Sequence, residues 1–231
     1  MPIEVELSHR INPRIKASFI AILFVMLVIL FILITINIFG MVFRELGYPP
    51  EYSIYFLFLS LLGNYVNLPI EKIISRLPSI SSKKGDYQKT GFAASYITHE
   101  RKTSIAVNVG GAVIPVLMSI FLFTFVKPID AMIGVLVMTA IVYKIAKPVK
   151  GSGIAIHALL PPFLAVAIAL MISPQDAPII AYISGTLGCL IGVDILNLKK
   201  IPDLGMKVVS IGGAGTFDAI FLTGVISVLL A

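Results

Sequence analysis

Hydrophobic residues form long runs in this chain, and short polar stretches separate one run from the next. Seven runs each come near the roughly 20 residues that an apolar helix needs to cross a bilayer. They cover residues 17–43, 51–70, 105–126, 129–146, 152–173, 177–198 and 208–230. Proline and glycine stand at their ends, as in "GYPP" and "SPQDAP". The pattern predicts an all-α, polytopic bundle of about seven membrane helices, some of them broken by Gly or Pro.

The composition supports a membrane protein. Hydrophobic residues make up 58% of the 231 positions and charged residues 13%, whereas a soluble domain carries about 25% charged residues. We therefore expect a cytoplasmic N-terminal segment, 1–16, followed by a single transmembrane domain, 17–231. The expected partner is the lipid bilayer and the expected location the cell membrane.

The basic residues predict the orientation. With the N-terminus inside, 16 of the 18 Lys and Arg residues lie on the cytoplasmic side, and only Arg44 and Lys127 lie outside. The positive-inside rule therefore places the N-terminus in the cytoplasm and the C-terminus outside. The formal charge of +6 is a topology signal, and no nucleic-acid partner is expected. The loop 71–104 is interpreted as a solvated connector, with a short interface helix over "FAASYITHERK" as the alternative.

Two acidic residues fall inside apolar runs, and both are candidate catalytic residues. A carboxylate in a bilayer is costly and marks a functional site by default. Asp194 lies about one turn from the cytoplasmic end of its run, so it could also reach water as a topology signal. Asp218 lies ten residues into the last run, which would be roughly 15 Å of helical rise. Its structural alternative is a protonated acid bonded to a neighbouring helix.

Other polar residues and helix breakers gather in the same cytoplasmic halves of the runs. Asn64 and Asn67 are three apart and would share a helical face, and Asp194 and Asn197 repeat that spacing. The third, fifth and seventh runs open on "NVGGAVIP", "GIAIHALLPP" and "SIGGAGTFD". Broken helix starts at membrane depth need protein or a water-filled cavity around them. We therefore predict one polar cavity, open to the cytoplasm and lined by the second, third, fifth, sixth and seventh runs.

The candidate residues for binding a substrate or an ion in that cavity are Asn64, Asn67, Asn108, Asn197, His157, Gly213 and Gly215. A lone intramembrane histidine also fits a hydrogen-bonded structural role. Gly188 and Gly192 are four apart and predict a close-packing helix face. The only cysteine, Cys189, lies in an apolar run, so neither a disulfide within the chain nor a thiolate metal site is expected. No other metal site and no cofactor are predicted.

Short matches suggest an internal repeat. "NVGGA" at 108–112 matches "SIGGA" at 210–214, and "NYVNL" at 64–68 matches "DILNL" at 194–198. The charge pattern gives both halves the same direction, so 51–126 and 177–231 would form a parallel repeat. Chance similarity is the alternative.

Four stretches make the chain similar to the uncharacterised membrane family called "domain of unknown function 1614". They are "NVGGAVIPV", "ALLPPF", "AYISGTLGCLIGVDILNL" and "SIGGAGTFDAIFLTG", within residues 55–231. The family name implies no activity.

A second, distant resemblance is to intramembrane aspartyl proteases of the presenilin and signal-peptide-peptidase type. Those proteins carry one catalytic aspartate in one span and a second, after a Gly-x-Gly motif, in the next. The resemblance implies Asp194 as the first acid and Asp218 as the second. Here Thr216 and Phe217 separate the glycine motif from the acid, and "HALLPP" precedes the aspartates although the related element follows them in the family.

Three functions stay open at this point. The first is hydrolysis of a membrane-spanning peptide, with two carboxyls sharing a proton as acid and base on a water. The second is a cation- or proton-coupled transporter of a small polar solute, with Asp218 as counter-charge or proton acceptor. The third is a non-enzymatic membrane scaffold in which both acids are structural.

Overall fold

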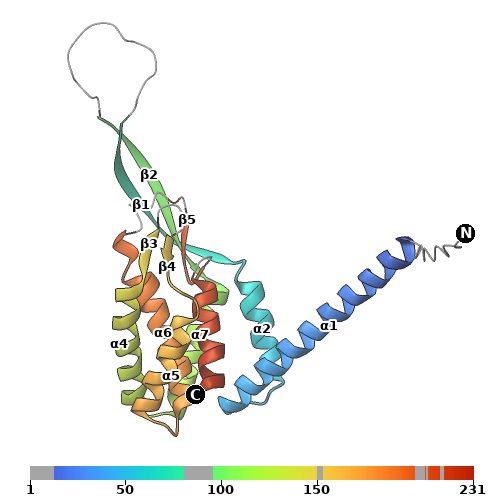
Figure 1. Ribbon diagram of the computed structural model, residues 1–231. Helices are drawn as coiled ribbons and strands as arrows, with labels where there is room; N and C mark the ends of the chain where they lie inside the picture. The colour runs from blue at the N-terminus through green and yellow to red at the C-terminus, as the bar shows by residue number, and fades with distance from the viewer. Residues whose placement is uncertain (1–12, 81–95, 150–152, 201–205, 207, 214–215) are drawn as a thin grey trace, which may run out of the picture.

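The computed structural model describes residues 13–80, 96–149, 153–200, 206, 208–213 and 216–231. Helices form a bundle, strands lie at one end of it, and a long N-terminal helix projects away from it (Figure 1). The α-helices are α1 (Pro13–Glu45), α2 (Tyr52–Gly63), α3 (Ile114–Leu122), α4 (Pro128–Ile145), α5 (Leu160–Ile172), α6 (Ala177–Cys189) and α7 (Phe217–Leu230). The strands are β1 (Asn67–Ile80), β2 (Tyr96–Asn108), β3 (Lys147–Val149), β4 (Gly153–Ala155) and β5 (Val208–Ile211). Two wide π-helical turns, η1 (Val109–Val113) and η3 (Leu190–Ile195), and a 3₁₀ turn, η2 (Phe123–Phe125), complete the described elements.

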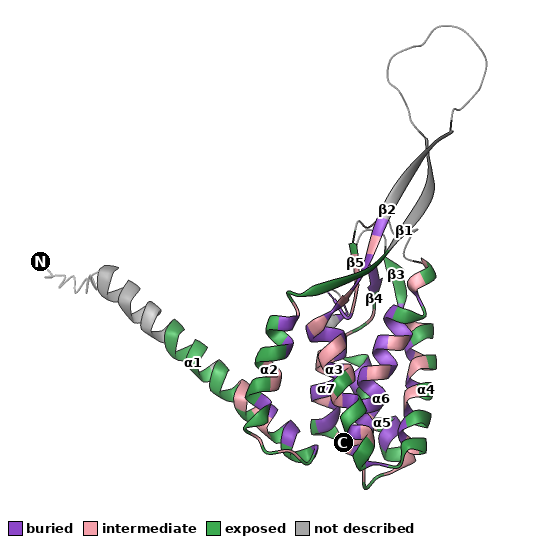
Figure 2. Ribbon diagram, turned by 180° about the vertical axis from the view of Figure 1, so that it is seen from behind, coloured by how far each residue is buried: buried purple, intermediate pink, exposed green. Residues whose placement is uncertain are grey.

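The helix α6 is the centre of the bundle. Buried residues line most of its length, whereas residues 24–30 and 32–34 of α1 are exposed (Figure 2). Its glycines allow close packing, because a Cβ at Gly188 would lie 2.5 Å from the Met138 side chain. A Cβ at Gly192 would lie 2.8 Å from the carbonyl oxygen of Thr139. The predicted close-packing face is therefore confirmed, and α4 is its partner.

Three helices are long and apolar enough to cross a membrane, by length and composition. They are Phe24–Glu45, Pro128–Ile145 and Ala177–Lys200. This finding is compatible with a membrane protein. Each of the seven predicted runs contains one α-helix, but five of these α-helices have only 9 to 14 residues, and α6 reaches the length of a span only together with the turns that continue it to Lys200. Seven spans and the positions of the two termini stay predictions.

The protein is mostly helical, as predicted, but it is not all-α, because the described residues also form two sheets. β1 and β2 pair antiparallel from Asn67↔Asn108 to Ile80↔Tyr96, and β5 joins β2 in parallel. β3 and β4 form a separate two-stranded sheet. The segments are rich in Ile, Val and Thr, which favour strands when a partner strand is available. The sheets also satisfy backbone groups that lie beyond the helix ends.

The loop 71–104 is therefore largely a β-hairpin where a solvated connector or an interface helix was expected. Residues 71–80 and 96–104 belong to β1 and β2. Residues 81–95 lie outside the described part of the chain. The hairpin rises from the end of the bundle at which the helix breaks gather (Figure 1).

Candidate functional site

Three segments change from strand to helix at the same end of the bundle. β2 continues into η1, β4 leads to α5, and β5 leads to α7. β5 runs parallel to β2, with Ser104 opposite Val208 and Val107 opposite Ile211. The "NVGGA" and "SIGGA" stretches therefore begin on neighbouring parallel strands. This placement explains how two segments about a hundred residues apart come to build one site, and whether they arose by duplication stays a prediction.

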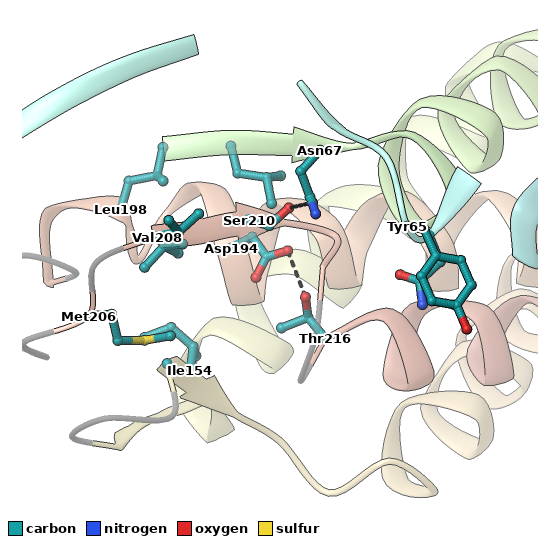
Figure 3. Close-up of a pocket in the computed structure, with 13 residues that line it drawn as sticks. Tyr65, Asn67, Ile154, Asp194, Leu198, Met206, Val208, Ser210 and Thr216 are labelled. Atoms are coloured by element: carbon teal, nitrogen blue, oxygen red, sulfur yellow. Dashed lines mark hydrogen bonds between the residues drawn. The ribbon is translucent and has the colours of Figure 1, made fainter. Parts of the chain in front are cut away.

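Asp194 lies at the junction of these segments. Only 7% of its surface is exposed. Its Oδ2 accepts a hydrogen bond of 2.6 Å from the backbone N–H of Gly212 and one of 3.1 Å from the hydroxyl of Thr216. Its Oδ1 accepts none from the described residues and is turned toward the side of the pocket that holds Ile154 and Met206 (Figure 3). One oxygen is thus held by neutral donors, and the other faces the pocket.

The wide turn η3 presents Asp194. The N–H of Leu196 bonds to the carbonyl of Ile191, five residues back, at 2.9 Å. A π-helical turn leaves carbonyls without their usual partners, and such turns are frequent at functional sites. The Asn197 amide donates to the carbonyls of Gly192 and Val193, at 2.9 Å each. Asn197 therefore supports the turn that positions Asp194 and does not line the cavity, contrary to its predicted role in binding.

Asp194 is one of the residues that line a cavity of about 390 Å³ (Figure 3). Its lining residues with polar side-chain groups are Asn64, Tyr65, Asn67, Asp194, Ser210 and Thr216. Apolar side chains from the segments around β4, η3 and β5 complete the wall. Among the described residues, no Lys, Arg or His lines it. A cavity with polar lining residues is therefore present, built by the second, fifth, sixth and seventh runs, with the third contributing indirectly through Asn108. Its opening to the cytoplasm stays a prediction.

Asn108 does not line the cavity itself, but it connects two residues that do. It is 1% exposed, and its amide donates to the Asn64 carbonyl at 2.7 Å and to Asn67 Oδ1 at 3.1 Å. Its own Oδ1 accepts from the N–H of Gly111 at 2.8 Å. The Ser210 hydroxyl also donates to Asn67 Oδ1. Asn64 and Asn67 do not share a helical face as predicted, because α2 ends at Gly63 and Asn67 begins β1. A third asparagine brings them together instead.

Glycines let the backbones meet at this junction. A Cβ at Gly63 would lie 2.8 Å from the backbone nitrogen of Gly110. Gly212 has a φ of +69°, and a Cβ there would lie 2.6 Å from the carbonyl carbon of Gly111. The two consecutive glycines of η1 thus contact the end of α2 on one side and the turn before α7 on the other. At this close approach the Gly212 N–H donates its hydrogen bond to Asp194.

Asp218 lies in the first turn of α7, and its side chain is outside the described part of the structure. The expectation that it lies ten residues into a helix is wrong, because 208–211 form a strand and α7 begins at Phe217. The pairing of the two aspartates stays a prediction.

The remaining predicted residues are dispersed. His157 lines a second cavity at the end of α4, away from Asp194. Gly213 is buried in the turn after β5, where a Cβ would collide with the Ser210 side chain. Gly215 lies outside the described residues.

Three residues of the site escaped the sequence-based selection: Ser210, Gly212 and Thr216. The signal for them was the "SIGGAGT" stretch itself, since a strand followed by glycines and a Ser or Thr before a helix is typical of a helix N-terminus. Thr216 occupies the N-cap position of α7, but its hydroxyl bonds to the carboxylate of Asp194.

The fold and the site together define a helical protein, compatible with a membrane location, in which strand-to-helix breaks enclose a buried carboxylate. The chain belongs to the family described as "Protein of unknown function (DUF1614)", which matches residues 61–230. This bears out the resemblance to that family. No curated protein and no solved structure matches the chain, so the resemblance to intramembrane aspartyl proteases gains no support from these comparisons.

Proposed function

We propose that the protein is a multi-pass protein of the cell membrane, with a cytoplasmic N-terminus, and that it carries a small cation or a small cationic solute through a site centred on Asp194. The observation that carries the proposal is the unbalanced charge of Asp194. Its carboxylate is buried, and its two donors in the described structure are the neutral Gly212 N–H and Thr216 hydroxyl.

An isolated buried carboxylate is costly unless a cation or a proton neutralises it. Among the described residues no basic side chain lines the cavity, so a cation that enters it would supply the missing charge. The free Asp194 oxygen faces the cavity, and the side-chain oxygens of Asn64, Asn67 and Ser210 belong to its lining residues. Carboxylate, amide and hydroxyl oxygens are suitable ligands for alkali cations and ammonium groups. The chemistry of the cavity therefore favours a small positive charge.

The broken segments also favour a carrier. In many transporters the binding site lies where membrane helices are interrupted, because freed backbone groups and half-helix ends face the cavity. Here the chain passes from strand to helix between β4 and α5 and between β5 and α7, and the π-helical turn η3 follows α6. Residues from all three of these segments line one cavity. Such junctions have few regular hydrogen bonds to break when a site opens to one side or the other.

Flux in proteoliposomes tests the proposal. We expect Na⁺, K⁺, an acid pulse or ethanolamine to evoke charge movement or uptake that Asp194→Asn reduces at least tenfold. The matched control is Asp176→Asn, which makes the same change at the loop before α6, where the carboxylate bonds to Ser173 at 3.1 Å. Flux of none of these probes, or equal flux in both variants and the unmodified protein, contradicts the carrier.

One observation keeps hydrolysis by an aspartate pair as a second candidate. The Thr216 hydroxyl holds the start of α7 against Asp194, and Asp218 follows Thr216 by two residues in the first turn of that helix. The backbone of Asp218 therefore begins close to the residue that holds Asp194, which supports a pairing of the two acids. A reporter with a single membrane-spanning peptide should then be cleaved by the unmodified protein and left intact by both Asp194→Asn and Asp218→Asn. Cleavage that survives either substitution excludes the pair, and a protein with neither flux nor cleavage fits the scaffold alternative.

A further inference from the structure

A second cavity, of about 700 Å³, lies at the end of α4 and carries the opposite charge. Its charged or titratable lining residues are Lys144, Lys147 and His157, and no acidic residue of the described structure lines it. The rest of the lining is mainly apolar, with Ile145, Val149, Ala155, Ile156, Ala158 and Leu160. The cavity thus combines two cations with a hydrophobic wall.

The fold brings these residues together from three elements. Lys144 is in the last turn of α4, and Lys147 begins β3, where it pairs with Ala155 of β4. His157 lies between β4 and α5, and its carbonyl accepts the N–H of Leu160 at 3.2 Å. Both lysines are exposed and have no ion-pair partner among the described residues. Two ammonium groups without counter-ions attract an anion.

The position of the cavity favours a lipid as the source of that anion. α4 is one of the helices long and apolar enough to cross a membrane, and Lys144 lies at its end. A helix end of this kind lies near the headgroup layer, where phosphate groups are abundant. Val149 and Leu160, both lining residues, expose 40% and 43% of their surfaces and would contact acyl carbons. Basic pockets beside membrane helices bind phosphate headgroups in this way.

We propose that this cavity binds the phosphate headgroup of an anionic lipid, with Lys144 and Lys147 as the cationic ligands and His157 as a further hydrogen-bonding group. The inference is independent of the function proposed for the Asp194 cavity. The shared chemistry is a phosphate anion, which a soluble phosphate could also supply, and the experiment separates the two sources.

Lipid retention, counted by mass spectrometry of the intact protein after release from nanodiscs, tests the proposal. Phosphatidylglycerol is titrated against phosphatidylcholine, and inorganic phosphate and glycerol 3-phosphate are added in parallel arms. We expect the unmodified protein to retain phosphatidylglycerol in preference to phosphatidylcholine. Each of Lys144→Gln and Lys147→Gln should weaken this retention about fivefold, and the double variant about 25-fold.

The matched control is Lys127→Gln, which removes an exposed lysine at the opposite end of the same helix and should leave retention unchanged. The double Lys→Arg variant keeps the charge and should retain the lipid, which separates loss of charge from loss of fold. Equal retention in the double Lys→Gln variant and the unmodified protein overturns the proposal, as does an equal loss in Lys127→Gln. Displacement of the lipid by millimolar inorganic phosphate or glycerol 3-phosphate overturns the lipid as the ligand.

Discussion

Two strand-to-helix breaks lie side by side in this protein, and they satisfy the same backbone need in different ways. Where β2 enters η1, the free N–H of Gly111 bonds to Asn108, a neutral residue of the same segment. Where β5 leads to α7, the free N–H of Gly212 bonds to Asp194, a carboxylate from a different helix. The first break shows that a neutral oxygen is sufficient for the structure. The negative charge at the second break is therefore not needed to satisfy the backbone N–H, and we attribute it to function.

The stability of the protein should be most sensitive to substitution where the two breaks approach each other. Gly212→Ala places a Cβ 2.6 Å from the backbone of Gly111 at a φ of +69°. Overpacking and the left-handed conformation together should cost about 4 kcal/mol of unfolding free energy. The single cysteine, buried Cys189, allows a direct readout, because a maleimide dye reacts with it only on unfolding. We expect the melting temperature to fall by about 12 °C.

The control for this prediction is Gly47→Ala. Gly47 has a φ of +81°, but a Cβ there would meet nothing within 4 Å. Its cost should be limited to the conformational part, about 1 kcal/mol. Similar losses for both variants would show that the contact between the two breaks contributes little.

Replacing the amide by a carboxylate at the first break, and the carboxylate by an amide at the second, should have unequal effects on stability. Asn108→Asp keeps the acceptor for Gly111 but removes the donors to Asn64 and Asn67, leaving their oxygens without these bonds. We expect a loss of about 2–3 kcal/mol, because the carboxylate that replaces the Asn108 amide is buried and would face the oxygens of half-buried Asn64 and exposed Asn67 with no donor between them. Asp194→Asn keeps an acceptor for both of its donors and should change stability by less than about 1 kcal/mol. Equal losses in the dye assay would contradict the distinction between a structural asparagine and a functional aspartate.

A loss of stability smaller than that of Asn108→Asp is expected when the hydroxyl that holds Asp194 is removed. Thr216→Val preserves the shape of the side chain and removes the 3.1 Å bond to Asp194 Oδ2. The cost should be about 1 kcal/mol, or roughly 3 °C in the dye assay, and Thr216→Ser should restore most of it. No change in Thr216→Val would show that the Gly212 N–H alone holds the carboxylate.

The sequence predicted the helices and the places where they are interrupted, because both are marked by residues that are close together along the chain. Long apolar runs gave one helix each, and Gly-Gly and Pro marked the places where helices begin late. Gly188 and Gly192 predicted the contact with α4 for the same reason, since small residues at this spacing form a packing face. Asn64, Asn67 and Asp194 were found because polar residues are rare in apolar runs.

The strands could not be predicted because their signals are not local. Residues 105–108 and 208–211 are as apolar as the helices that follow them, and periodicity does not separate a short buried strand from a helix. Their extended form depends on pairing, between Asn67 and Asn108 and between Val107 and Ile211. The role of Thr216 escaped notice for a related reason, since its partner Asp194 lies 22 residues away on another element.

The most direct test of the account is the effect of cations on stability with and without the Asp194 charge. Melting is followed through Cys189 in increasing NaCl, KCl or ethanolamine hydrochloride, with N-methyl-D-glucamine chloride keeping the ionic strength constant. A cation that binds only the folded protein at 100 times its Kd stabilises it by about 2.7 kcal/mol. We predict that at least one small cation raises the melting temperature of the unmodified protein and leaves that of Asp194→Asn unchanged. Equal responses of the two proteins, or no response to any of the cations, would contradict the claim that a cation balances the Asp194 charge.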